Sequence, residues 1–168
     1  MDIKKIKKDI RREISAHVIR EGQITRDFIK DITYRIFASL PKDHDYYKLG
    51  DAAKKKIVEA ICDDFMGLGP LQQLMDDPGI TEIMVNGPYK VYIEKSGKKV
   101  LSGVEFDDES HLRYIVEKML APTGRRVDES YPYVDFSLED GSRINVIIPP
   151  LAVGGAVEIG RASCRERV

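Results

Sequence analysis

Residues 134–148 read VDFSLEDGSRINVII, and this stretch decides the fold class of the second half of the chain. Apolar side chains take every second position in both of its arms, at Val134, Phe136, Leu138, Ile144, Val146 and Ile148. Such alternation is typical of strands with one buried face, because successive side chains of a strand point to opposite sides. Between the arms lies Asp140-Gly141, a strong signal for a two-residue turn. The stretch therefore predicts a β-hairpin, which is ended by Pro149-Pro150.

Upstream of this hairpin, the sequence predicts more strands and one helix. Residues 83–85 and 91–94 are short apolar runs that indicate strands, and Ser96-Gly97 indicates a hairpin turn after the second run. Either Asp107 or Asp108 is expected to cap a helix with one apolar face. The predicted fold class is α+β, with a mostly antiparallel sheet and a packed helix.

The first part of the chain, residues 1–66, predicts a separate helical unit. In its first helix, over residues 2–20, aliphatic side chains recur every three or four positions, at Ile3, Ile6, Ile10, Ile14 and Val18. The opposite face of this helix is basic and holds Lys4, Lys5, Lys8, Arg11 and Arg12. Thr25 and Asp51 are the expected caps of two further helices. Cys62 lies on the apolar stripe of the third helix and is expected to be a small buried hydrophobe.

Composition excludes several functional classes. The 168 residues carry 27 Lys and Arg against 28 Asp and Glu, a net charge of −1, which excludes a globally basic nucleic-acid binder. No run of 18 apolar residues occurs, so we expect no transmembrane helix. The N-terminus is charged and has no apolar signal segment, which favours a cytosolic protein. The two cysteines have no spacing that predicts a disulfide framework or a metal site.

No self-contained catalytic motif is present. A phosphate-binding loop needs the pattern GxxxxGK[ST], and neither it nor GxGxxG, HExxH or GxSxG occurs. Arginines stand out in two places, Arg125 and Arg126 in the loop 124–130 and Arg143 just after the Asp140-Gly141 turn. Arginines on loops and turns are suited to bidentate binding of phosphate oxygens. The alternative is an ion pair with a nearby carboxylate, for which the candidates are Asp128, Glu129 and Asp135.

Four short blocks lie in order along the chain. They are GLGPL at residues 67–71, TEIMVNGP at 81–88, GRRVDES at 124–130 and DGSRIN at 140–145, the last continuing to Pro149-Pro150-Leu151. In this order, the blocks resemble the N-terminal domain of the type II/IV secretion-system ATPases, over Asp51 to Val157. The branch that they resemble most is the CpaF-like ATPase of tight-adherence (Flp) pilus assembly. Each block is weak alone, and the set is specific.

The resemblance implies a domain that precedes a RecA-like ATPase domain, with nucleotide bound between the two. It implies ATP and Mg²⁺ as ligands of the full-length parent, and no cofactor for this fragment. Arg143, together with Arg125 and Arg126, matches the positions that face the nucleotide phosphates. The implied partners are the RecA-like domain, further copies in a homo-hexamer and a secretion platform protein of the inner membrane, with no nucleic acid. The implied location is the cytoplasmic face of that membrane, where the ring drives pilus assembly or protein export.

The sequence also departs from the family pattern. The RecA-like half is absent, and with it the Walker A lysine and the Walker B carboxylate, so we expect a truncated fragment that is inactive by itself. Residues 158–168 read EIGRASCRERV, which resembles translated adapter or vector sequence, and we expect a non-native tail there. The expected domains are therefore 1–66, 67–157 and this tail. The alternative function is a stand-alone cytoplasmic interaction module that recruits a membrane or protein partner through its basic first helix.

Overall fold

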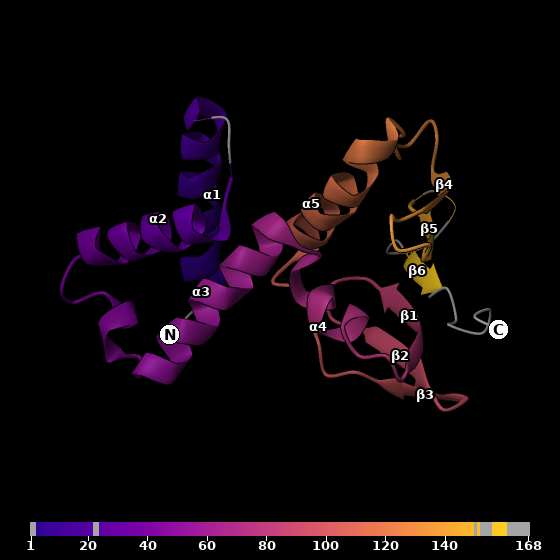
Figure 1. The fold of residues 1–168 in the computed structure, drawn as a ribbon, viewed down its shortest axis with the longest axis horizontal. Coiled ribbons are helices and arrows are strands. Elements are labelled where there is room, and N and C mark those ends of the chain that lie inside the picture. Colours follow the sequence, from indigo (N-terminus) through magenta and orange to yellow (C-terminus); the bar gives the residue numbers. More distant parts are fainter. Residues whose placement is uncertain (1–2, 22–23, 150, 152–155, 161–168) are drawn as a thin grey trace. The chain divides into compact units, whose positions relative to one another are not determined.

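The computed structural model describes residues 3–21, 24–149, 151 and 156–160 (Figure 1). The helices are α1 (Ile3–Glu21), α2 (Arg26–Ser39), α3 (Asp51–Met66), α4 (Gln72–Met75) and α5 (Glu109–Leu120), with 3-10 turns η1 (Asp45–Lys48), η2 (Gly69–Leu71) and η3 (Ala121–Thr123). The strands are β1 (Ile80–Asn86), β2 (Val91–Lys95), β3 (Lys98–Leu101), β4 (Tyr133–Ser137), β5 (Arg143–Ile147) and β6 (Ala156–Gly160). The chain divides into two compact units, Met1–Gly69 and Pro70–Val168. The boundary lies three residues after the one predicted from the sequence, which follows residue 66.

The first unit consists of α1, α2 and α3, joined by short loops and the turn η1. Their apolar faces form a core of Ile6, Ile10, Ile14, Ile29, Ile32, Phe37, Tyr46, Leu49, Ile57, Val58, Ile61 and Cys62. Thr25 caps α2 as expected, because its Oγ1 accepts a hydrogen bond from the Phe28 N–H at 3.2 Å. The N-cap of α3 is Gly50, one residue before the expected Asp51. Burial raises the pKa of the Cys62 thiol, which therefore stays protonated as a small core side chain.

Arg11 departs from the predicted basic face of α1. Its side chain is 12% exposed, and its Nη1 donates to Oδ2 of Asp64 on α3 at 2.7 Å. Asp64 itself is 2% exposed, so the pair lies inside the unit. Arg12 does fit the prediction, with a side chain that is 76% exposed and an ion pair to Asp9 one turn away. Helical periodicity could not separate these two arginines, because the partner of Arg11 lies 53 residues further along the chain.

The strands of the second unit form one six-stranded sheet in the order β3-β2-β1-β6-β5-β4, with every neighbouring pair antiparallel. The predicted α+β fold class is confirmed. A row of apolar register partners crosses the whole sheet, through Phe136, Ile144, Ile159, Ile83, Ile93 and Val100. Helix α5 lies beside the β4–β6 half of the sheet, and its apolar side chains are buried (Figure 1). Its N-cap is Asp108, which accepts from the His111 N–H at 2.8 Å.

The two hairpin turns differ from each other in length. Ser96 and Gly97 form the expected two-residue turn between β2 and β3, and both have positive φ, 54° and 72°. Between β4 and β5 the loop has one residue more than expected and consists of residues 139–141. Its hydrogen bonds run from Gly141 N–H to Leu138 O and from Leu138 N–H to Ser142 O, both at 2.9 Å. Gly141 has φ 84°, the left-handed residue that closes a three-residue loop with a bulge.

Strand β6 overlaps the first residues of the expected tail. Residues 158–160, which we expected to be patternless and non-native, belong to β6 and pair with both β1 and β5. The physical reason is that β6 pairs the backbone N–H and C=O groups along the facing edges of β1 and β5. The register places Ile159 opposite Ile83 and Ile144, and Val157 opposite Val85 and Val146, so apolar residues meet apolar residues. Residues 161–168, with Cys164, lie outside the described residues.

Candidate functional site

Arg143 begins β5 and points away from the apolar face of the sheet. Ile144 and Val146 on the same strand are buried, whereas the Arg143 side chain is 71% exposed, as strand alternation predicts. Its Nη2 donates to Oδ2 of Asp135 on the neighbouring strand β4, at 2.9 Å. One of the ion pairs considered as an alternative is therefore formed, and it leaves most of the guanidinium facing solvent.

Arg125 lies in the loop that leads from η3 to β4. Its N–H donates to Oγ1 of Thr123 at 3.1 Å, which holds the start of the loop. Its side-chain Nη1 donates to the main-chain oxygen of Asp135. The structure thus brings Arg125 and Arg143 together at a single residue, although 18 positions separate them in the sequence.

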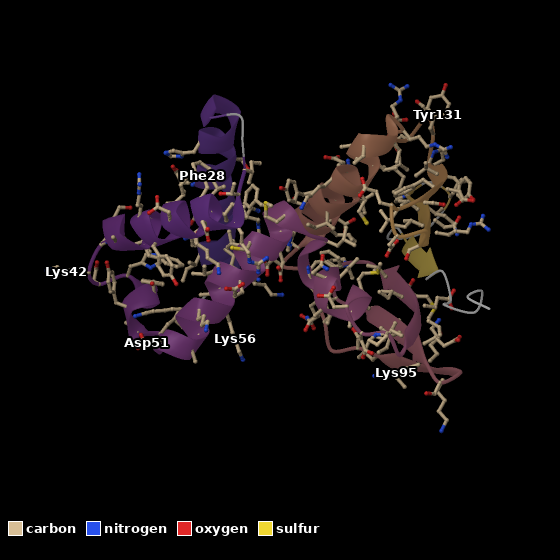
Figure 2. The ribbon with its side chains drawn as sticks, viewed as in Figure 1. Phe28, Lys42, Asp51, Lys56, Lys95 and Tyr131 are labelled. Carbon is tan, nitrogen blue, oxygen red and sulfur yellow. The ribbon has the colours of Figure 1, made fainter. Side chains whose placement is uncertain are left out.

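Arg126 contacts Asp128 and Tyr131 of its own loop. Its Nε lies 3.2 Å from Oδ2 of Asp128, and its guanidinium lies 5.3 Å from the centroid of the Tyr131 ring. Asp128 also accepts hydrogen bonds from the N–H groups of Ser130 and Tyr131, both at 2.9 Å. Figure 2 shows Tyr131 at the tip of this loop, beyond the end of α5. Arg126 therefore forms a second cluster, distinct from the pair at Asp135.

Two neutral side chains beside the pair were not singled out from the sequence. The Tyr133 hydroxyl donates to Oδ1 of Asn145 at 3.1 Å, and Asn145 is the direct register partner of Asp135. Both lie on the same face as Arg143, because Tyr133, Asp135, Asn145 and Arg143 all occupy the alternate positions of their strands. The alternation that located Arg143 would also have located Tyr133 and Asn145.

Arg125, Arg126 and Arg143 are all exposed residues. A cavity of about 60 Å³ lies between α5 and β5, lined mainly by apolar side chains such as Leu112, Val116 and Val146, and it contains none of the three arginines. Exposed guanidinium groups suit phosphate oxygens, which they bind through charge-assisted hydrogen bonds. In the described part of the chain, no cluster of three or more His, Cys, Asp or Glu side chains has the arrangement of a metal site. Exposed arginines of this kind are able to bind an anion.

Among the residues that the structure describes, no helix combines the length and the hydropathy needed to cross a membrane.

Comparison with known proteins relates the second unit to secretion machinery. A putative conjugal transfer protein of Mycobacterium tuberculosis is 27% identical over 113 residues, which cover 64% of this chain and 32% of that protein. The type IV secretion system protein VirB11 of Brucella suis is 29% identical over 92 residues, which cover 55% of this chain and 26% of VirB11. The crystal structure of the VirB11 ATPase of Brucella suis, in complex with sulphate, superposes with a TM-score of 0.54 at 31% identity. That match covers 60% of this chain and 32% of the VirB11 chain, so the chain spans a minor part of each relative.

The family match defines the extent of the relationship. The family described as "Type II/IV secretion system protein" matches residues 64–159, more than half of the 168 residues. The match starts inside α3 and ends inside β6, so it takes in the arginine pair and most of β6. The resemblance is confirmed at the level of this family, while the CpaF-like branch stays a prediction. The chain belongs to the type II/IV secretion system protein family.

Proposed function

We propose that the chain is the nucleotide-facing part of a secretion or pilus-assembly ATPase and is not catalytic by itself. The observation that carries this proposal is the pair of guanidinium groups at Asp135, one of them on a side chain that is 71% exposed. Both arginines are exposed, and Arg143 lies on the face of the sheet opposite the buried Ile144 and Val146. Such a face fits a phosphate chain presented by a second domain.

In this proposal, a RecA-like domain binds ATP and Mg²⁺, which supply the phosphates and their metal. Arg143 and Arg125, which meet at Asp135, approach these phosphates, and Arg126 contributes less because Asp128 and Tyr131 hold it in its own cluster. Arginine side chains that meet a phosphoryl group stabilise the negative charge that moves during its transfer. The role of this chain's residues is therefore to bind and orient the phosphates and to offset their charge.

The branch of the family, the assembly and the location are proposed from the resemblance of the sequence blocks. We propose a CpaF-like protein that assembles as a homo-hexamer at the cytoplasmic face of the inner membrane, with a platform protein as partner and pilus assembly or export as the work done. Two relatives are described by the names conjugal transfer protein and type IV secretion system protein, which supports a transport machine. The alternative, an interaction module based on a basic α1, has less support because Arg11 is withdrawn from that face by Asp64.

The test is the substitution Arg143→Ala in a protein where this chain is joined to its RecA-like domain. ATP turnover should fall by about 10-fold or more, as it does when a charge-stabilising arginine is removed. Arg143→Lys should recover little, because a point charge cannot replace a planar fork of donors. In the isolated chain the same alanine variant should keep its stability within about 0.5 kcal/mol, since the side chain is exposed. Wild-type turnover in the joined Arg143→Ala protein would show that Arg143 forms only a surface ion pair.

A further inference from the structure

Asp135 is the residue at which the two arginines meet. Its Oδ2 accepts the hydrogen bond from Nη2 of Arg143 at 2.9 Å, and its main-chain oxygen accepts one from Nη1 of Arg125. Arg143 comes from β5 and Arg125 from the loop that follows η3, so two separate segments are tied to the middle of β4. The Asp135 side chain is 34% exposed against 71% for Arg143, so the carboxylate lies closer to the sheet than the guanidinium it holds.

We propose that Asp135 is a positioning residue of the phosphate-binding site, which sets the guanidinium of Arg143 beside that of Arg125 so that both act on the same anionic group. The inference rests on the proposed function, because it takes the phosphates to bind at Arg143. Arg126 stands outside the pair, since Asp128 and Tyr131 hold it in its own cluster.

Arg143 keeps hydrogen-bond donors that an anion can use while it is bound to Asp135. The hydrogen bond to Asp135 engages Nη2, and a guanidinium has five N–H donors, so others remain for an anion. An arginine that is already ordered by Asp135 loses less conformational freedom when it binds a phosphate. Asp135 also has an opposing effect, because its negative charge repels the anion and competes for the same guanidinium. The two effects have opposite signs, so one substitution can tell them apart.

The experiment titrates the 168-residue chain, labelled with ¹⁵N in its arginines, with sodium tripolyphosphate, and follows the arginine Nε–Hε signals by NMR. In the wild type, the signals of Arg125 and Arg143 should shift along one common binding curve, and that of Arg126 should shift less. Asp135→Asn keeps the main-chain oxygen that binds Arg125 and removes the carboxylate charge. It should weaken tripolyphosphate binding by about 2- to 10-fold, the factor expected when one flexible side chain must be ordered on binding. Asp135→Glu, which keeps the charge, should recover part of this loss.

The matched control is Asp128→Asn, which makes the same change of charge beside Arg126 and should not weaken binding. If Asp135→Asn binds tripolyphosphate as tightly as the wild type or more tightly, Asp135 only competes with the anion and the inference is overturned. Backbone amide spectra check that each variant is folded, and Asp135→Ser serves in place of Asp135→Asn if that variant is not. If Arg143→Ala binds like the wild type, the phosphate site itself fails and the proposed function falls with it. If Arg143→Ala loses binding while Asp135→Asn does not weaken it, only the positioning role is wrong.

Discussion

Arg11 and Arg143 are both paired with an aspartate of another element, yet their surroundings give the two pairs different roles. The Arg11–Asp64 pair has side chains that are 12% and 2% exposed, whereas those of Arg143–Asp135 are 71% and 34% exposed. Removing one partner of a buried pair leaves an uncompensated charge in a poorly solvated place, and removing one partner of an exposed pair does not. The first pair is therefore structural, and the second is available for binding.

At the scale of single residues, we predict that Arg11→Ala destabilises the first unit. The loss should be about 3–5 kcal/mol, because the substitution removes the ion pair that Arg11 makes with the buried Asp64 carboxylate. Urea unfolding followed by circular dichroism measures it. The control is Arg12→Ala, on the same helix and 76% exposed, which should change stability by about 0.5 kcal/mol or less. Equal losses in the two variants would contradict a buried role for Arg11.

At the scale of elements, β6 decides whether the second unit has one sheet. It lies between β1 and β5, and without it the sheet would separate into the three strands β3-β2-β1 and the hairpin β5-β4. An isolated two-stranded hairpin is marginally stable in water. The arginine pair lies on that hairpin side, since β4 carries Asp135 and β5 carries Arg143. The strand at 156–160 therefore supports the candidate site although none of the three arginines lies on it.

We predict that a chain ending at residue 155 loses the cooperative unfolding of its second unit, because both neighbours of β6 lose their partner. A chain ending at Gly160 keeps every strand pairing described and should melt close to the 168-residue chain. Thermal melts by circular dichroism compare the three lengths, and amide spectra show which signals disperse. A cooperative melt at unchanged temperature for the chain that ends at residue 155 would mean that β6 contributes nothing to folding.

At the scale of the whole molecule, the chain corresponds to a minor part of its relatives. The three arginines are exposed, and none of them lines the cavity of about 60 Å³ beside α5. The family match covers residues 64–159, and the chain spans 32% of the VirB11 chain of known structure. Under the proposed function, ATP hydrolysis uses a phosphate-binding loop of a RecA-like domain, a motif that does not occur in these 168 residues.

We expect the purified chain to hydrolyse no ATP, because a phosphate-binding loop is needed to hold the β- and γ-phosphates and Mg²⁺. A phosphate-release assay on protein from two successive, different columns measures this. Arg143→Ala provides the control, because a contaminating ATPase would give the same rate in both preparations. Turnover that survives purification and falls in Arg143→Ala would show that this chain carries a catalytic site of its own.

The sequence alone determined the features that depend on neighbouring residues. Apolar periodicity located the helices and the β4–β5 hairpin, and strand alternation placed Arg143 on the exposed face. Thr25 marked the start of one helix, and the start of another was narrowed to Asp107 or Asp108. These features are local, because a helix or strand shows its buried face in residues at most four positions apart. The four blocks of sequence likewise indicate the family, because each block is a short run of neighbouring residues.

Only the tertiary structure decided the features that join distant segments. Arg11 is largely buried and pairs with Asp64 on α3, and β6 pairs with both β1 and β5. Asp135 accepts hydrogen bonds from two arginines of different segments. The loop at Gly141 has three residues because the register of β4 and β5 sets its length. Local periodicity predicts none of these contacts. Each of them depends on which distant residues the whole fold brings within a few ångströms of one another.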